Sequence, residues 1–278
     1  MKKFVLLFFV AFMSTYILAQ TAGGTITRPS HRSQIKKTSS KMTKQQILQN
    51  LIENMVYVEG GIFMMGATME QDTDANEDES PIRMVTLNSF KIGKYEVTQR
   101  EWKAVMGNDI PWHPQMGDNY SIQLSWSECQ IFISRLNSLT GCNFRLPTEA
   151  EWEFAAKGGN KTNRYKYAGG EDINDVAWYK DNSVDKYHQI GGKKSNELGL
   201  YDMSGNNFEW CSDWYGKYNP DQKVNPQGAP KPNGGARHVI RGGNVYSPAS
   251  DCRLTSRGSC GDDAFSRPGL RLVLSVPN

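Results

Sequence analysis

The most informative segment of the chain reads GLYDMSGNNFEW and spans Gly199–Trp210. It mixes turn-forming glycines with amides, carboxylates and aromatic residues. No helical or strand period fits it, so it predicts a rigid loop that enters a short strand. Carboxylate oxygens of Asp202 and Glu209, together with backbone carbonyls, are the hard ligands that calcium prefers. The same spacing also suits a loop in which a buried Glu209 pairs with an arginine, because calcium needs about six to eight oxygens.

The N-terminal residues predict export. Residues 1–19 are interpreted as a secretory signal peptide, since Lys2 and Lys3 precede an apolar run at Phe4–Ala11 and a small residue stands at Ala19. The apolar run is too short for a spanning helix, so we expect no transmembrane segment after signal removal. The mature protein is therefore expected to be periplasmic, on the outer surface or secreted.

Charge divides the chain unevenly. Eight basic residues and no acidic residue precede Glu53, which leaves 24 of the 32 basic residues against all 29 acidic ones. This acidic body lacks the basic excess typical of a nucleic-acid surface, so nucleic acid is not an expected partner. Residues 20–54 are interpreted as a basic linker that ends in a short helix, because few large apolar residues occur before Thr43.

Residues 55–278 predict one α+β domain. Three helices are expected at 99–106, 125–139 and 148–156, because each begins with a hydroxyl–carboxylate pair three residues apart. A long stretch rich in Gly, Asn, Asp and aromatic residues follows at 160–218, where inward-packed aromatic rings would replace regular structure. The expected strands and loop are a hairpin of 55–58 with 61–65 around Glu59–Gly60, an acidic loop at 72–80, a strand at 84–92, and closing strands at 238–242 and 269–276.

The cysteines and histidines form no recognisable metal motif. The chain has 5 cysteines and 4 histidines, without a CxxC pair or a Cys/His cluster of zinc-binding spacing. In an oxidising compartment, an odd number of cysteines leaves at least one thiol unpaired or in an intermolecular bond.

Several short motifs occur in an order that resembles the sulfatase-modifying-factor family, whose namesake is formylglycine-generating enzyme. The resemblance covers residues 55–278. The matching motifs are Val56–Gly66, Tyr95–Thr98, Arg145–Glu153, Gly199–Trp210, Arg241–Gly243 and Gly269–Arg271.

The resemblance implies an α+β, C-type-lectin-like formylglycine-generating-enzyme fold with little regular secondary structure. It also implies a calcium ion as cofactor. In the family this ion is bound by a side chain before the Gly-Asn pair, by two backbone carbonyls and by a glutamate. The corresponding positions here are Asp202, Gly205, Asn207 and Glu209.

Copper is the second cofactor that the resemblance suggests. The family enzyme oxidises a sulfatase cysteine to formylglycine with oxygen, and it binds copper(I) between two cysteines five residues apart. These positions fall on Ser247 and Cys252, which makes Cys252 the candidate catalytic residue. A serine hydroxyl is a hard, weak ligand for copper(I), so only half of the usual thiolate pair is present. The alternative for Cys252 is a packed or disulfide-bonded cysteine.

Two functions remain open at this stage. The first is an exported, calcium-stabilised binding or scaffold module with a protein or peptide partner, which lacks the full copper site. The second is an active oxidase that converts a sulfatase cysteine to formylglycine. Because one fold hosts many activities, the resemblance leaves open whether the protein is an enzyme.

Overall fold

The computed structural model describes residues 42–107, 116–262 and 267–276. The predicted signal peptide and most of the predicted linker lie outside the described residues. In the described part of the chain, no helix is long and apolar enough to cross a membrane.

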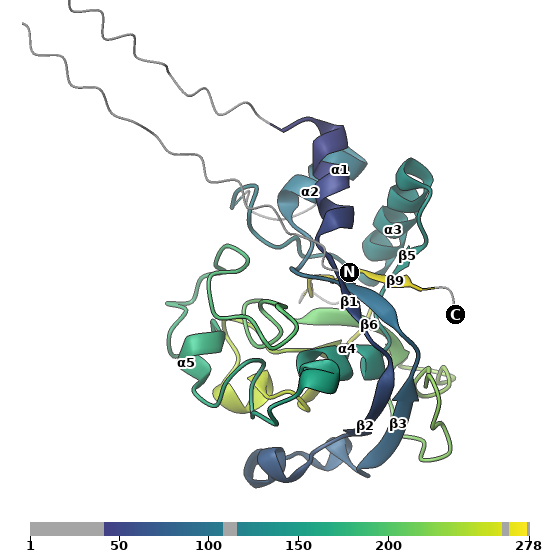
Figure 1. Ribbon diagram of the computed structural model, residues 1–278, viewed down its shortest axis with the longest axis vertical. Helices are drawn as coiled ribbons and strands as arrows, with labels where there is room; N and C mark the ends of the chain where they lie inside the picture. Colours follow the sequence, from purple (N-terminus) through teal and green to yellow (C-terminus); the bar gives the residue numbers. More distant parts are fainter. Residues whose placement is uncertain (1–41, 108–115, 263–266, 277–278) are drawn as a thin grey trace, which may run out of the picture. The chain divides into compact units, whose positions relative to one another are not determined.

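A sharply bent, two-stranded ribbon forms one end of the molecule (Figure 1). Strand β1 (Met55–Val58) pairs antiparallel with β4 (Phe90–Gly93), and β2 (Gly61–Met65) pairs with β3 (Arg83–Leu87). The predicted hairpin of 55–58 with 61–65 is therefore wrong, because these consecutive strands pair with other partners. The single strand predicted at 84–92 is likewise divided into β3 and β4.

Gly60 explains why the ribbon bends instead of turning back on itself. A Cβ atom at Gly60 would lie 2.5 Å from the carbonyl oxygen of Leu87 and 2.7 Å from the amide nitrogen of Ser89. Glycine therefore lets the two strands of the ribbon cross at close range, and the chain passes from β1 straight into β2.

Two sheets complete the β structure. The first has the order β1-β4-β9-β5, with β9 at Val273–Ser275 and β5 at Phe144–Arg145. The second has the order β6-β7-β8, with β6 at Glu209–Trp214, β7 at His238–Arg241 and β8 at Arg257–Cys260. Strand β8 was not predicted, because its sequence RGSC shows no apolar alternation.

All three predicted helix starts are confirmed. Helices α2 (Gln99–Met106), α3 (Trp126–Thr140) and α4 (Glu149–Ala156) each carry a complete capping box. The short N-terminal helix α1 (Lys44–Glu53) is capped by Thr43 and buries Leu51. All eight residues of α4 are buried, so this helix lies within the core.

The stretch 160–218 has little regular structure, as predicted. The only named elements between the C-terminus of α4 and β6 are the short η3 (Gly159–Lys161) and α5 (Ile173–Val176), within a fully described range. Aromatic side chains such as Tyr167 and Tyr179 are buried, which confirms their predicted inward packing.

The acidic segment predicted as a loop at 72–80 carries more structure than expected. It contains the end of one short 3₁₀ helix, η1 (Met69–Asp74), and the whole of another, η2 (Glu77–Glu79). A further 3₁₀ helix, η4 (Ala249–Cys252), precedes Arg253. Glu79 is fully buried and accepts hydrogen bonds from the Arg253 guanidinium at 2.9 and 2.5 Å. This ion pair fastens the segment to the C-terminal part of the chain, 174 residues away.

Candidate functional site

Glu209 begins β6 and its carboxylate is buried in an ion pair. Arg271 donates to it from Nε at 3.0 and 2.9 Å and from Nη2 at 2.5 Å. The indole N–H of Trp152 adds a fourth contact at 2.7 Å. Three N–H donors therefore engage the two carboxylate oxygens, which offer about four acceptor positions. The arginine-paired alternative for Glu209 is therefore present in the structure, and calcium binding by Glu209 stays a prediction.

Asp202 stands in the loop ahead of Glu209 with a positive φ of 59°. The short polar side chains of Asp and Asn tolerate this left-handed conformation better than bulky ones. One carboxylate oxygen, Oδ2, accepts the backbone N–H of Gly191 at 2.7 Å. Gly205, also at positive φ, lies so close to Trp178 that a Cβ atom would come 2.3 Å from its carbonyl oxygen. The loop is thus held rigidly against residues 178–191.

Glu96 joins this site, although the sequence did not single it out. Its Oε2 atom accepts a hydrogen bond from the side-chain amide of Asn206 at 2.6 Å. Its Oε1 atom is buried and has no hydrogen-bond partner within the described residues. Burial and the neighbouring charges of Asp202 and Glu209 raise the pKa of Glu96 well above its usual range. Only the Tyr95–Thr98 motif pointed to this residue, and it gave no chemical role.

The charge balance of this cluster fits a divalent cation. With all side chains ionised, Glu96, Asp202 and Glu209 carry −3 against the single positive charge of Arg271, a balance of −2. Burial raises the pKa of Asp202 to about 6, with a further contribution from Glu209. A hard cation would offset this charge and occupy the unpaired Glu96 oxygen.

Backbone groups would have to complete such a site. Within the described residues, no group of three or more His, Cys, Asp or Glu side chains is placed to hold a metal ion. The carbonyl oxygens of Gly205 and Asn207 accept no hydrogen bond in the described part of the chain. The candidate calcium ligands are therefore Asp202, Glu96 and these two carbonyls, because Arg271 already engages Glu209.

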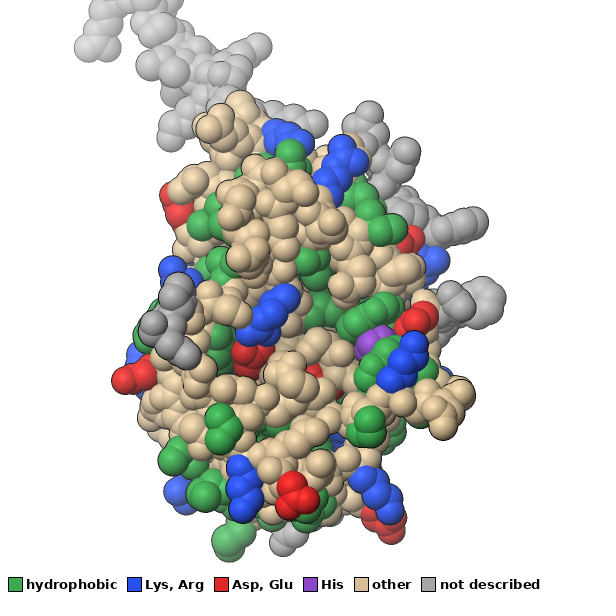
Figure 2. All heavy atoms as spheres, turned by 90° about the vertical axis from the view of Figure 1, so that its right-hand side faces the viewer, with side chains coloured by type: hydrophobic (Ala, Val, Ile, Leu, Met, Phe, Trp, Pro, Cys, Tyr) green, Lys and Arg blue, Asp and Glu red, His purple; other side chains and the backbone are tan. Residues whose placement is uncertain are grey.

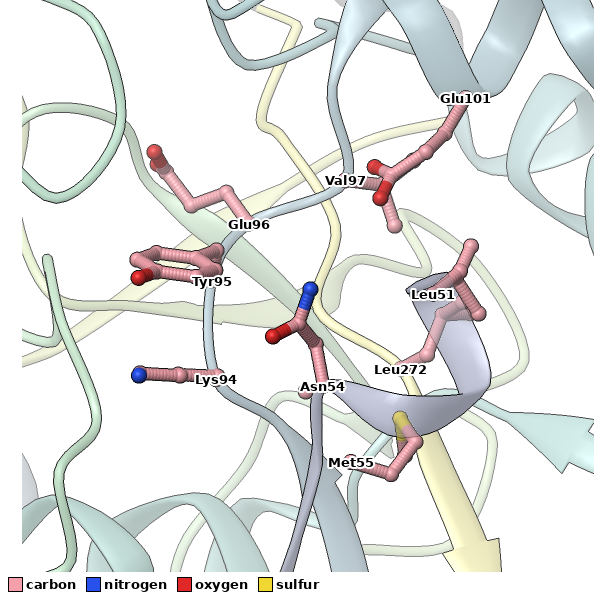
Figure 3. Close-up of a pocket in the computed structure, with 10 residues that line it drawn as sticks. Leu51, Asn54, Met55, Lys94, Tyr95, Glu96, Val97, Glu101 and Leu272 are labelled. Carbon is pink, nitrogen blue, oxygen red and sulfur yellow. The ribbon is translucent and has the colours of Figure 1, made fainter. Parts of the chain in front are cut away.

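A cavity lined in part by Glu96 is too small for a substrate. It has a volume of about 20 Å³ and lies between the end of α1, the β4–α2 connection and Leu272. Figure 3 shows Glu96 pointing away from Leu51 and Asn54, which line the other side of the cavity. A space of this size accommodates about one water molecule.

Ser247 and Cys252, which stand at the positions of the family's copper ligands, make other contacts in this structure. The hydroxyl of Ser247 accepts the backbone N–H of Asn244 and donates to the Asn244 side chain, both at 3.1 Å. The Cys252 side chain is fully buried among apolar residues that include Tyr167 and Val176. Burial, with the charge of Asp251 adding to it, raises the pKa of the Cys252 thiol to about 12. Cys129, Cys142, Cys211 and Cys252 are free thiols.

Other chains share this fold and these motifs. A family model described as "Sulfatase-modifying factor enzyme 1-like domain" matches residues 39–276, so the chain belongs to this family. The solved structure titled "Treponema denticola variable protein 1" is similar over 79% of this chain and 94% of that one, with a TM-score of 0.68 and 27% identity. The α+β formylglycine-generating-enzyme fold expected from the sequence is confirmed.

Similar proteins carry different names. "Chaperone protein LppX" of Paenibacillus barcinonensis is 30% identical over 220 residues, which cover 59% of this chain and 72% of that protein. "Formylglycine-generating enzyme" of Thermomonospora curvata is 26% identical and is matched over 80% of this chain and 94% of its own length. "Serine/threonine-protein kinase Pkn1" of Chlamydia trachomatis is 29% identical over 75% of this chain, but only 36% of its own length is matched.

Proposed function

We propose that this protein is an exported, calcium-stabilised binding or scaffold module of the sulfatase-modifying-factor family, and that it does not form formylglycine by the copper mechanism. The observation that carries the proposal is the state of the two copper positions. Ser247 supplies a neutral hydroxyl that Asn244 already engages, and Cys252 supplies a buried thiol with a pKa of about 12.

The chemistry of copper(I) explains why this observation matters. Soft, charged thiolates bind copper(I) tightly, whereas a neutral hydroxyl is a hard and weak ligand. A thiol whose pKa lies near 12 stays protonated at neutral pH, and the thiolate is the ligand and nucleophile. Cys252 is also pressed against the backbone, because a Cβ atom at Gly243 would lie 2.6 Å from its Sγ atom. These features favour a packing role for Cys252.

The calcium part of the proposal rests on the buried acidic cluster. Asp202 and Glu96 would contribute carboxylate oxygens, and Gly205 and Asn207 would contribute carbonyl oxygens. When bound, calcium would supply positive charge that stabilises the loop at 199–210 and would take no part in redox chemistry. The unpaired oxygen of Glu96 supports this assignment.

The relatives also support a role other than oxidation. The domain matches part of a chain named as a kinase and most of a chain named as a chaperone, so it occurs in proteins with different names and lengths. A protein or peptide partner for this chain is consistent with that variety.

The second candidate function is oxidation of a sulfatase cysteine. The Arg241–Gly243 turn and Cys252 are in place, and relatives named as formylglycine-generating enzyme match most of the chain. In this case a sulfatase would be the partner, and the thiol of Cys252 would have to lose its proton when copper binds.

A direct test separates the two candidates. Reduced protein is titrated with copper(I) in competition with a chromophoric chelator, and is then incubated in air with a Cys-x-Pro-x-Arg peptide. We expect weak copper binding and no aldehyde, and we expect Ser247→Cys to gain copper affinity. Aldehyde formation that Cys252→Ala abolishes would establish the oxidase instead.

Calcium needs its own measurement, because the copper test does not address it. We expect the melting temperature to fall in EDTA and to recover with excess calcium, since a ligand that binds only the folded state stabilises it. Identical melting curves under both conditions would exclude calcium from the proposal.

A further inference from the structure

One face of the β2–β3 ribbon is apolar and uncovered. Phe63, Met65, Val85 and Leu87 point into the core, so the alternate residues point outward. These outward residues are hydrophobic rather than polar: Ile62 is 64% exposed, Met64 45% and Met84 57%. Ile82 and Met69 extend the patch, with Met69 92% exposed. A contiguous apolar surface of this kind marks an interaction site in a soluble protein.

The outer edge of β2 also carries unused backbone groups. Thr86 donates its N–H to Lys223 and accepts from Asn225, so both of its backbone groups point away from β2. Its partner Ile62 is therefore in a non-hydrogen-bonded pair, and the N–H and C=O of Ile62 point away from β3. Met64 follows the same alternation, and its carbonyl accepts from the Lys157 ammonium at 3.0 Å. No hydrogen bond to Ile62 N–H, Ile62 C=O or Met64 N–H is made within the described residues.

A groove runs along this edge. Its volume is about 650 Å³, and Ile62, Met64 and Met84 line it together with residues of α4 and the segment that follows α4. The opposite wall includes Phe154, Lys157 and Arg164. Figure 1 places β2 and β3 at the end of the molecule opposite to α1, and Figure 2 shows hydrophobic side chains on the surface of the same lower end.

One cation of the groove lacks a counter-charge. Lys157 is paired with Glu153 at 2.9 Å. Arg164 has a positive φ of 60°. Its guanidinium makes no ion pair or hydrogen bond among the residues that the structure describes. The only acidic side chain in the lining, Glu70, accepts a hydrogen bond from Thr68. An occupant with a carboxylate near Arg164 would therefore complement the groove in charge.

We propose that the outer edge of β2 binds an extended segment of a partner polypeptide, which adds to the ribbon as a third strand. The segment would pair with Ile62 and Met64, place apolar side chains two residues apart against the exposed face, and carry an acidic residue toward Arg164. This inference specifies the partner class within the binding role proposed above. It is independent of calcium and copper, so its failure and theirs can be told apart.

The unused backbone groups favour a polypeptide strand over other occupants. Added strands gain affinity from main-chain hydrogen bonds and specificity from alternate side chains, which are the two features that the edge and the apolar face offer. A lipid surface would cover the methionines but would leave the donors of Ile62 and Met64 unpaired. Unpaired donors that lose water are unfavourable, so a lipid fits the groove less well.

The test uses the full chain and a library of fluorescent seven-residue peptides. Each peptide has apolar residues at alternate positions and an aspartate at either end. The matched set has N-methylated amides along one strand edge, which removes the donors for pairing. We expect binding by unmodified peptides and at least about a tenfold loss with the N-methylated set, since one or two hydrogen bonds are at stake.

Three variants locate the binding. Ile62→Pro removes the outward N–H of an edge strand, where proline is tolerated, and replaces the exposed isoleucine by a smaller apolar side chain. We expect a loss of about tenfold or more. Met84→Lys introduces a charge on the apolar face away from the edge, and we expect it to weaken peptide binding. This variant tests the apolar face even if Ile62→Pro does not fold. Val224→Lys is the matched control, because Val224 is also 64% exposed and does not line the groove.

Several results would overturn the proposal. The first is that no peptide of the library binds more weakly to Met84→Lys than to the unchanged protein. The second is that the N-methylated peptides bind as tightly as the unmodified ones. Dimerisation measured by light scattering and abolished by Met84→Lys would assign the surface to a second copy of this chain. Binding to phosphatidylglycerol vesicles that Met84→Lys abolishes and Ile62→Pro leaves intact would assign it to lipid.

Discussion

At the scale of single residues, the candidate site contains four buried ionisable side chains with few groups to balance their charges. They are Glu96, Asp202, Glu209 and Arg271. Arg271 and Trp152 together engage both oxygens of Glu209, whereas one oxygen of Glu96 has no partner within the described residues. The charge of Asp202 raises the pKa of Glu96, and the charge of Glu209 in turn contributes to the raised pKa of Asp202. Buried charge without compensation is unfavourable, so protons or a cation must stabilise this cluster.

The first prediction concerns pH in the absence of calcium. The pKa of Asp202 is raised to about 6 in the folded protein from an ordinary value of 3.8, so folding takes up a proton between these values. The resulting stabilisation is fully present below about pH 4 and is lost as pH rises through about 6. In EDTA, we expect Asp202→Asn to reduce the difference in unfolding free energy between pH 5.5 and 7.5.

The control for this prediction is Asp118→Asn, because Asp118 is a partly exposed carboxylate paired with Arg100 and Lys103. It should leave the difference between the two pH values unchanged. If Asp202→Asn behaved in the same way as Asp118→Asn, the proton uptake would belong to another group.

The second prediction concerns Glu96 and calcium. Glu96→Gln preserves the shape and the contact with Asn206 but removes a buried negative charge. We expect it to maintain or raise the melting temperature in EDTA and to diminish the gain that calcium produces. Calorimetric titration should show weaker calcium binding by Glu96→Gln. An undiminished calcium affinity would show that Glu96 lies outside the ion's coordination.

At the scale of elements, the ribbon depends on close backbone contact at one residue. Capping boxes define the helices locally, because the hydroxyl and carboxylate lie three residues apart in the chain. The ribbon is not defined locally in this way. Strands β1 and β2 are consecutive in the chain, but β1 pairs with β4 and β2 pairs with β3. Between β1 and β2, the backbone at Gly60 lies so close to Leu87 and Ser89 that a Cβ atom would clash with them.

The third prediction tests this contact. Gly60→Ala would place a Cβ atom 2.5 Å from the carbonyl oxygen of Leu87, so the backbone must shift. We expect a destabilisation of about 1–3 kcal/mol, the usual range for overpacking. Chemical denaturation measures it directly. Gly234→Ala is the control, because a Cβ atom there meets nothing within 4 Å and should leave stability nearly unchanged.

At the scale of the whole molecule, buried Arg–Glu pairs fasten segments that are distant in the chain. Arg253 binds Glu79, Arg271 binds Glu209, and Arg257 binds Glu149. Each pair joins the C-terminal part of the chain to an earlier segment. In a domain with much irregular structure, such ion pairs hold loops that helices and strands do not fasten.

The fourth prediction is a double-mutant cycle on the most distant of these pairs. Arg253→Met leaves the buried Glu79 without its partner and should cost about 3–5 kcal/mol of unfolding free energy. The double variant with Glu79→Met should cost less than the two single changes together, since no isolated charge remains.

The exposed pair of Arg100 and Asp118 offers a comparison for this cycle. Arg100→Met should cost no more than about 1 kcal/mol, because water screens an exposed pair. Equal costs for Arg253→Met and Arg100→Met would mean that the buried pair does not fasten the segment.

The family, the fold class, the three helix starts and the loop that ends in Glu209 could be predicted from the sequence. These features depend on residues near one another in the chain: a capping box needs three residues, and the Gly199–Trp210 motif needs twelve. Local hydrogen bonds and turn geometry are readable from such spacing.

The pairing of the strands and the contacts between buried charges could not be predicted from the sequence. Strand pairing follows from contacts between distant segments, so β1 and β2 read as a hairpin although each pairs elsewhere. Glu96 and Arg271 reach Asp202 and Glu209 only after the chain has folded, and Arg271 is 62 residues from Glu209. Burial then sets the pKa of Asp202 and Cys252, because the loss of water around a charge depends on the whole packed domain.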